Sequence, residues 1–358
     1  MTTLSNVSIA KLHAYVDECV DKTVQSQTRP NKNQLIVLSG GSASNVGTFV
    51  EAMERMGVIN DARLQLDSEA IIDSGAVPEF TEIASRGYKH PEKLTDRSRK
   101  IFHYLLIDAA DYYLQQLEKK GVSGGTIVVD DHCENILVPM ALAWRTKNKG
   151  GKNETTPEGE TGYVCVARDP RLGIDSAIDR ALAGGGAIAP KLQLDTYRLQ
   201  PKNWERLSQC RKFFDVAVLA DMNYAYGKTP PIVAQRIARN ETAVLDHEKL
   251  AAFNCAKDIP EGAASKQEVF PNGTPDKQYR QSIGGGPISK KDVQSFSFED
   301  ALDGQGSFVE RISSNMPHKE GSQTVGGSHH TMVDDAFGDA GFLDKIGNSP
   351  IDSQLGRR

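Results

Sequence analysis

The first group of residues that could do chemistry lies in the segment 36–48, IVLSGGSASNVGT. An apolar run stops there at a pair of glycines, and a small polar loop then leads into a stretch that favours a helix. In this strand–loop–helix context, backbone N–H groups and a helix N-terminus bind phosphate oxygens. The candidate phosphate-binding residues are Gly40, Gly41, Ser42, Ser44, Asn45, Gly47 and Thr48.

The same segment lacks the lysine that such loops normally use. Alignment with the pattern G-x-x-x-x-G-K-[ST] places Gly41 at the first position and Thr48 at the last. Val46 and Gly47 then occupy the positions of the second glycine and the lysine. The Thr48 hydroxyl remains as a ligand for Mg²⁺, but no cation is left for the β- and γ-phosphates. By analogy with a missing oxyanion donor, this loss would slow phosphoryl transfer on the order of a thousandfold.

Acidic residues follow two of the predicted strands. Asp67 and Glu69 come after the segment 63–66, where a general base for phosphoryl transfer would lie. Asp130, Asp131 and His132 follow the apolar segment 126–129, and carboxylates suit Mg²⁺, so Asp130 is a candidate metal ligand together with Thr48. An acidic residue after a strand can equally be an ordinary helix N-cap, and both interpretations remain open.

Strand-like and helix-like patterns alternate between residues 33 and 255, and this alternation predicts an α/β fold. A parallel sheet covered by helices in three layers has its ligand crevice at the carboxyl ends of the strands. The two acidic segments, which follow strands, are therefore expected at the same edge of the sheet. The predicted strands are 34–38, 63–66, 126–129, 163–167 and 216–219. The predicted helices are 46–56, 96–119, 135–146, 171–183 and 203–213.

Three other segments complete the predicted organisation. Residues 1–32 are expected to form a short N-terminal helical segment, with apolar residues at helical spacing. The polar stretch 148–161 is expected to be a loop inserted into the domain 33–255. Residues 256–358 are rich in Gly, Ser and Asp, so we expect an irregular extension that is either disordered or ordered by packing on a protein partner or on its own domain.

Composition excludes several classes of protein. The chain has 358 residues, of which 39% are hydrophobic, but no apolar stretch approaches 18 residues, so no membrane span is expected. A net charge of −5 gives no electrostatic case for nucleic acid. The five cysteines are scattered without a C-x-x-C pair, as in proteins of a reducing compartment, and no secretory signal is visible. These features favour a cytoplasmic protein.

Between about residues 33 and 253 the chain resembles the zeta-toxin family of P-loop kinases. The resemblance lies in the order and texture of segments more than in identity. The segments that resemble the family, after the glycine-rich loop, are Leu66–Glu69, Val77–Phe80, Ile127–Asp131, Arg168–Pro170, the helix with Arg180, Phe214–Val218, Thr229–Ala234 and Val244–Asp246. Gly47, in place of the lysine, and Val46, in place of the second glycine, depart from the family pattern.

The resemblance implies a kinase that uses Mg-ATP or Mg-GTP to phosphorylate a small substrate such as a UDP-activated amino sugar. It further implies that Thr48 ligates Mg²⁺, that Asp67 or Glu69 accepts the substrate's hydroxyl proton, and that Arg180 holds phosphate oxygens. Lys191, Arg198 or Arg180 could replace the missing lysine, although solvated surface charges are the ordinary interpretation of such residues.

Three hypotheses about function follow. The missing lysine and the long extension favour a pseudokinase, in which a zeta-toxin-like domain acts as a binding or assembly module in a larger complex. The alternative is an active small-molecule kinase with an unorthodox phosphate clamp. A third hypothesis is a component of a secretion or virion assembly, whose extension becomes ordered only in that complex.

Overall fold

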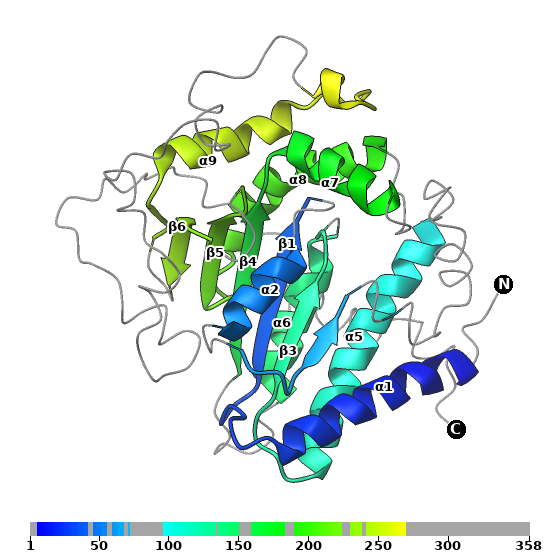
Figure 1. The fold of residues 1–358 in the computed structure, drawn as a ribbon. Helices are drawn as coiled ribbons and strands as arrows, with labels where there is room; N and C mark the ends of the chain where they lie inside the picture. The colour runs from blue at the N-terminus through cyan, green and yellow to red at the C-terminus, as the bar shows by residue number, and fades with distance from the viewer. Residues whose placement is uncertain are drawn as a thin grey trace.

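The computed structural model describes residues 6–41, 46–55, 59–67, 71, 96–133, 135–149, 159–182, 190–223, 230–237 and 241–269. These residues form one seven-stranded sheet with helices packed against it (Figure 1). None of the described helices is long and apolar enough to cross a membrane.

The sheet has the strand order β2-β3-β1-β4-β5-β6-β7. The strands are β1 (Gln34–Gly40), β2 (Leu64–Leu66), β3 (Thr126–Asp130), β4 (Glu160–Ala167), β5 (Val216–Asp221), β6 (Ile232–Ile237) and β7 (Ala243–Val244). The helices are α1 (Asn6–Gln25), α2 (Val46–Arg55), α5 (Asp96–Lys119), α6 (Leu137–Lys149), α7 (Pro170–Leu182), α8 (Pro190–Gln209) and α9 (His247–Asn254). Two short 3₁₀ helices, η2 (Cys255–Asp258) and η3 (Lys266–Glu268), follow them.

The predicted three-layer α/β fold is confirmed, and its first five strands are parallel. The strands β6 and β7 are antiparallel to their neighbours, so the sheet is mostly rather than wholly parallel. These two strands were not expected from the sequence. Side chains from both faces of β1 are buried, as expected for a central strand between two helical layers.

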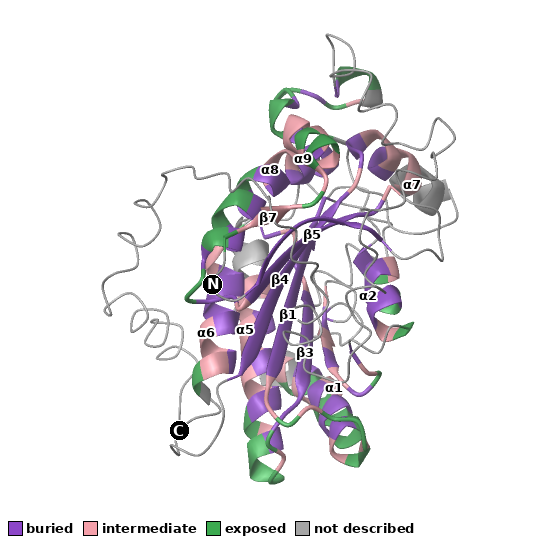
Figure 2. Cartoon of the chain, turned by 90° about the vertical axis from the view of Figure 1, so that its left-hand side faces the viewer, coloured by how far each residue is buried: buried purple, intermediate pink, exposed green. Residues whose placement is uncertain are grey.

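Two apolar clusters separate the layers, and Figure 2 shows the buried strands between helices on both sides. On one face, side chains of α1, α5, α6 and α8 pack with alternate strand residues such as Leu35 and Val129. On the other face, Phe49 and Met53 of α2 pack against Ile36 and Leu38. Because successive strand residues point to opposite faces, one short strand supplies both clusters.

The strand register brings the carboxyl ends together at one edge. Leu38 of β1 lies opposite Asp130 of β3, and Gly40 lies opposite Val166 of β4. Leu66 of β2 in turn lies opposite Val129. The residues that follow these strands therefore lie close to the glycine turn, which we define as residues 40–48.

Some predicted boundaries are wrong. The helix expected at 203–213 is α8, which begins at Pro190 and contains Pro201. The expected loop 148–161 is shorter at both ends, because α6 continues to Lys149 and β4 begins at Glu160.

The described chain also continues to pack after residue 255. Ala256, Ile259 and Val269 are buried in a third apolar cluster against Leu194 and Tyr197 of α8. For residues 256–269, packing on the chain's own domain is therefore the expected alternative that the structure shows, whereas the two short 3₁₀ helices were not expected. Residues 270–358 lie outside the described part of the chain.

Candidate active site

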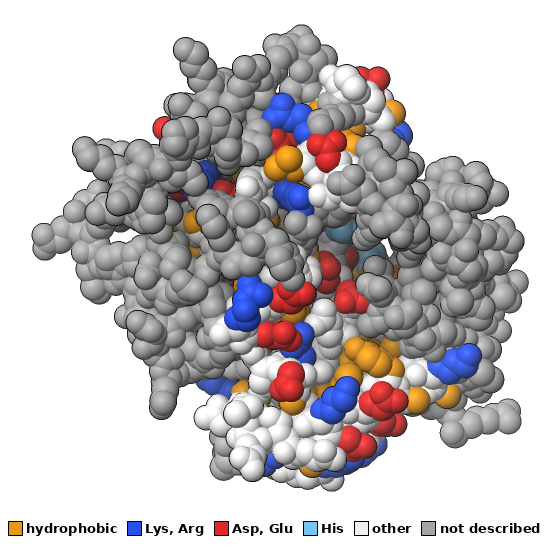
Figure 3. Space-filling view, viewed as in Figure 1, with side chains coloured by type: hydrophobic (Ala, Val, Ile, Leu, Met, Phe, Trp, Pro, Cys, Tyr) orange, Lys and Arg blue, Asp and Glu red, His pale blue; other side chains and the backbone are white. Residues whose placement is uncertain are grey.

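The structure brings Asp67 and Asp130 close enough to interact electrostatically. Asp67 follows β2 and Asp130 ends β3, and the two strands are neighbours in the sheet. Acidic and histidine side chains gather near the centre of the molecular face in Figure 3. The predicted proximity of the two acidic segments is thus confirmed for these two residues, which we call the carboxylate pair. Glu69 lies outside the described residues.

Asp130 is the most perturbed member of this group. Burial raises the pKa of its carboxyl to about 7, and the negative charges of Asp67 and Asp131 add to the rise, whereas His132 opposes it. A carboxylic acid that titrates near neutral pH is an unusual feature, and such perturbed groups concentrate at functional sites.

The turn after β3 is fixed by hydrogen bonds to its backbone. His132 donates from Nδ1 to the Gly40 carbonyl oxygen (2.9 Å), so this nitrogen holds a proton. From α8, the Gln200 and Asn203 amides donate to the carbonyl oxygens of His132 and Cys133, each at 3.0 Å. Cys133 has a φ of 53°, in the left-handed region that side chains rarely adopt. The clamped backbone holds this strained residue, and the carboxylates next to it, in place.

The glycine turn starts directly after β1, beneath a tyrosine ring. A Cβ atom on Gly41 would lie 2.3 Å from the Tyr197 ring, so glycine is the residue that fits there. Gly47, in the first turn of α2, has open space where a Cβ would stand, and Thr48 next to it is half-buried. Ser42, Ser44 and Asn45 lie outside the described residues, so their predicted contacts with phosphate stay predictions.

An arginine at the end of β4 lies beside the glycine turn. Arg168 donates from Nη2 to Ser176 Oγ (2.7 Å), and it interacts electrostatically with Tyr197, the residue that covers Gly41. Burial lowers the pKa of its guanidinium, although Tyr197 and Asp169 oppose that shift. Arginine side chains stay charged in proteins, so Arg168 contributes a positive charge here.

The other cations considered as replacements for the lysine lie elsewhere. Lys191 is exposed and pairs with Asp195 at 3.1 Å, one turn along α8. Arg198 pairs with Asp195 (3.1 Å) and with Glu261 (3.7 Å). Arg180 belongs to α7, but its side chain is outside the described part of the structure.

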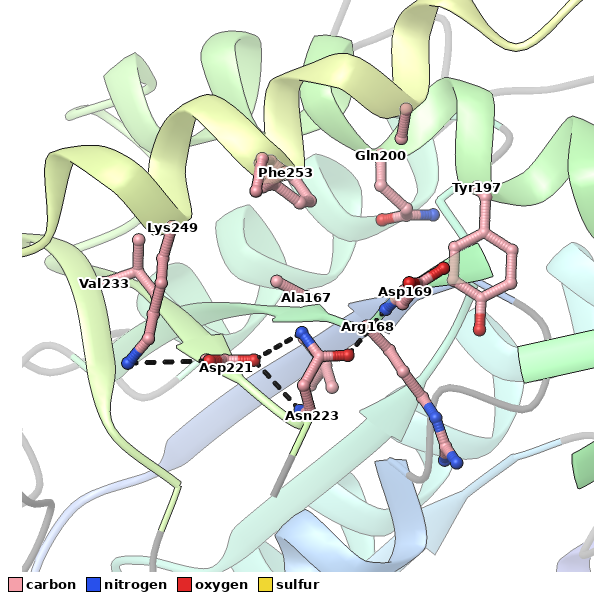
Figure 4. A pocket seen from close by; sticks show the side chains of 13 residues that line it. Ala167, Arg168, Asp169, Tyr197, Gln200, Asp221, Asn223, Val233, Lys249 and Phe253 are labelled. Carbon is pink, nitrogen blue, oxygen red and sulfur yellow. Dashed lines mark hydrogen bonds and ion pairs between the residues drawn. The ribbon is translucent and has the colours of Figure 1, made fainter. Parts of the chain in front are cut away.

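A second polar cluster occupies the carboxyl ends of β4 and β5 and was missed by the sequence analysis (Figure 4). Asp221 accepts hydrogen bonds from the backbone N–H (2.9 Å) and the side-chain amide (2.7 Å) of Asn223. Lys249 of α9 lies 3.6 Å from its other oxygen. Burial raises the pKa of Asp221, and both neighbours oppose the rise. The acidic end of β5 was a visible signal, because the same rule had identified Asp67 and Asp130.

This second cluster encloses little space. The cavity among Arg168, Tyr197, Asp221 and Lys249 has a volume of about 20 Å³, enough for about one water molecule. Within the described residues, the buried Tyr197 hydroxyl has no hydrogen-bond partner. A water molecule there would satisfy it, whereas a nucleobase would not fit without movement of the walls.

The oxygen atoms of the site suit a Mg²⁺ ion that is held by only a few protein ligands. The described residues include no group of three His, Cys, Asp or Glu side chains placed to hold a metal ion. Mg²⁺ commonly takes one or two carboxylates and completes its octahedron with water and substrate phosphates. The oxygens of Thr48 and Asp130 fit that mode of binding.

No family model and no curated protein matches the chain. Among solved structures, it is similar to one from the PezAT chromosomal toxin–antitoxin system of Streptococcus pneumoniae, with 14% identity over 61% of this chain and 79% of that chain and a TM-score of 0.40. It is also similar to the AvrRxo1-ORF1:AvrRxo1-ORF2 complex with sulphate ions (11% identity, 84% of this chain and 88% of that chain, TM-score 0.42) and to the same complex with ATP (10%, 86% and 86%, 0.41). At such TM-scores, none of these structures assigns a function to this chain.

The fold itself follows from the sheet. The central β1 is followed by a glycine turn and α2, and β3 and β4 flank it on either side in parallel register. The chain therefore has the P-loop kinase type of fold that the resemblance to zeta toxins implied.

Proposed function

We propose that this chain is a phosphotransferase that uses Mg-ATP or Mg-GTP to phosphorylate a hydroxyl group of a small substrate. The main support is the carboxylate pair, because Asp67 and Asp130 lie at the carboxyl edge of the sheet beside the glycine turn. Phosphoryl transfer needs a proton acceptor and a metal ligand near the phosphates. A protein that only used the fold as a scaffold would have no need for two carboxylates there.

The two carboxylates have different roles in this proposal. Asp67 accepts the proton of the substrate hydroxyl as its oxygen attacks the γ-phosphorus, the bond to the β,γ-bridging oxygen breaks, and the nucleoside diphosphate leaves. Asp130 and Thr48 would hold Mg²⁺, which neutralises charge on the β- and γ-phosphates when bound. Phosphoryl transfer depends on such positioning and charge neutralisation more than on covalent chemistry.

Arg168 is the residue that we propose in place of the loop lysine. It stands at the end of β4, next to the strand that begins the glycine turn, and interacts with the tyrosine that covers Gly41. A guanidinium binds phosphate oxygens in bidentate fashion, so it can supply the positive charge that Gly47 lacks. Arg180 of the following helix is a second candidate from the family resemblance.

Labelled phosphoryl transfer tests this function. The full-length protein is incubated with γ-labelled ATP or GTP, Mg²⁺ and a UDP-activated amino sugar, and the label on the sugar is measured over time. We expect transfer by the wild type and none above background by Asp67→Asn. Absence of nucleotide binding at millimolar concentration in the wild type would contradict the proposal.

A second candidate function is the binding or assembly module, because the glycine turn offers no lysine and Gly47 faces open space. In that case the protein would bind nucleotide or a protein partner without transfer, with partner contacts in residues 256–358. Nucleotide binding that is equal in the wild type and Asp67→Asn, with no labelled product from either, would favour this second function.

A further inference from the structure

The hydrogen bonds around Asp67 extend back to α2, the helix that follows the glycine turn. Gln65 is the middle residue of β2, and Arg63 and Asp67 are the residues directly before and after this strand. Glu54 lies near the end of α2, six residues after Thr48, which is about 9 Å along a helix. An ion pair joins Glu54 to Arg63.

Arg63 fixes the orientation of the Gln65 amide. It donates to Gln65 Oε1 from Nη2 (2.9 Å) and from Nε (3.3 Å). An amide has its oxygen on one side and its nitrogen on the other, so holding Oε1 toward the guanidinium turns Nε2 away from it. Gln65 Nε2 then donates to Asp67 Oδ2 at 3.3 Å.

The surroundings hold this arrangement in place. The side chain of Arg63 is only 11% exposed, and its Nη1 also donates to the Asn60 carbonyl oxygen at 2.8 Å. The Tyr15 hydroxyl of α1 donates to the backbone carbonyl of Gln65 at 2.8 Å. Because Arg63 and the backbone of Gln65 are both held by these hydrogen bonds, the Gln65 amide has one preferred orientation.

We propose that Arg63 and Gln65 are positioning residues that orient Asp67 and connect it to the helix that begins at the phosphate-binding turn. We call Glu54, Arg63 and Gln65 the relay. The N–H donor on Oδ2 restricts rotation of the Asp67 carboxylate, so the group keeps one orientation at the edge of the sheet. The catalytic role of Asp67 in this inference rests on the proposed phosphotransferase function, whereas the relay itself does not.

The relay is tested first without any assay of activity. The full-length protein is labelled with ¹⁵N-glutamine, and the side-chain amide resonance of Gln65 is compared between the wild type and two variants. Asp67→Asn replaces the charged acceptor of the Gln65 amide, so we expect this resonance to shift. Arg63→Lys keeps the charge but not the fork of N–H donors, so it should shift the same resonance. A Gln65 resonance that is unchanged in both variants would overturn the inference.

Kinetics then separate positioning from folding. Gln65→Leu should lower kcat by about tenfold to a hundredfold, as loss of a residue behind a metal ligand does in other enzymes, with the Kd for Mg-nucleotide within twofold. The matched control is Gln209→Leu, because this exposed glutamine donates to Thr242 far along the chain from the carboxylate pair. Equal losses in both variants, or a loss in nucleotide affinity alone, would contradict the relay. If the wild type shows no transfer, the proposed function fails, and the amide resonance still decides on the relay.

Discussion

The two halves of the candidate site are built in different ways. On the carboxylate side, Asp67 accepts from Gln65, and the turn with Asp130 is clamped by His132, Gln200 and Asn203. On the phosphate side, Gly41 lies under a tyrosine ring and Gly47 faces open space. The groups suited to acid–base chemistry are thus held by several hydrogen bonds, whereas Gly47 stands where a phosphate-binding loop normally has its lysine. The two sides of the site therefore make different predictions for substitution.

The largest expected effect is on the carboxylate side. Asp67→Asn removes the proton acceptor, so we expect kcat to fall by about a hundredfold to ten-thousandfold, the range for general-base catalysis. Asp61→Asn is the control, because that residue is exposed near the same strand. Labelled transfer measures both variants. A wild-type rate of transfer in Asp67→Asn would show that the carboxylate side of the site does not supply the proton acceptor.

A substitution on the phosphate side should gain function. Gly47→Lys places an ammonium where a side chain meets no neighbouring atom within 4 Å. A charged hydrogen bond to phosphate contributes about 1.5–3 kcal/mol, so we expect the affinity for Mg-ATP or Mg-GTP to rise about tenfold or more. Gly47→Met is the matched control of similar length without the charge. Equal calorimetric affinities in both variants would show that the turn does not face the phosphates.

The raised pKa of Asp130 predicts how stability depends on pH. The folded protein holds a proton on Asp130 up to about pH 7, whereas the unfolded chain releases it near pH 4. The folded state therefore binds more protons between these values, and the free energy of unfolding falls as pH rises from 4 to 7, by on the order of 3 kcal/mol. Asp130→Asn should remove this part of the slope in urea unfolding at pH 4.5 and 7.5. Identical slopes in the two proteins would contradict the assignment.

The smallest effects compare two cations. Arg168→Gln should weaken nucleotide binding about tenfold, because it removes one charged contact with phosphate. Lys191→Gln should leave the affinity within twofold, since its exposed pair with Asp195 contributes about 0.3–0.5 kcal/mol to the helix alone. Calorimetric titration with Mg-ATP measures both, and thermal unfolding verifies that Arg168→Gln is folded. The reverse order of effects would identify Lys191 as the replacement for the loop lysine.

The sequence predicted those parts of the molecule that depend on local pattern. Apolar runs such as 34–38 and 126–129 identified central strands, and the acidic residues after neighbouring strands met as expected. The strand β6 was not predicted because Gln235 and Arg236 lie in it. Both are buried, and Arg236 is tolerated there since it donates to the Ser208 and Phe214 carbonyl oxygens. The carbonyl groups that make the burial of Arg236 possible belong to segments distant in sequence, so the sequence pattern near β6 does not reveal them.

The beginning of α8 and the relay show two further limits. Residues 190–202 are mostly polar and contain Pro201, so the sequence pattern does not indicate a helix there. In the structure they form the first part of α8, and Tyr197 of this helix packs on Gly41. Nothing in the sequence indicates that Arg63 would meet Glu54, because that contact depends on how α2 packs against the sheet. The residues that orient a site were therefore harder to predict than the acidic residues themselves.

The most direct test of the account is single-turnover transfer from γ-labelled nucleotide by the wild-type protein and Asp67→Asn in parallel. The account predicts a labelled sugar phosphate with the wild type and none with the variant, while both bind Mg-nucleotide with the same affinity. Bound nucleotide without product in either protein would contradict a catalytic carboxylate pair at this edge of the sheet.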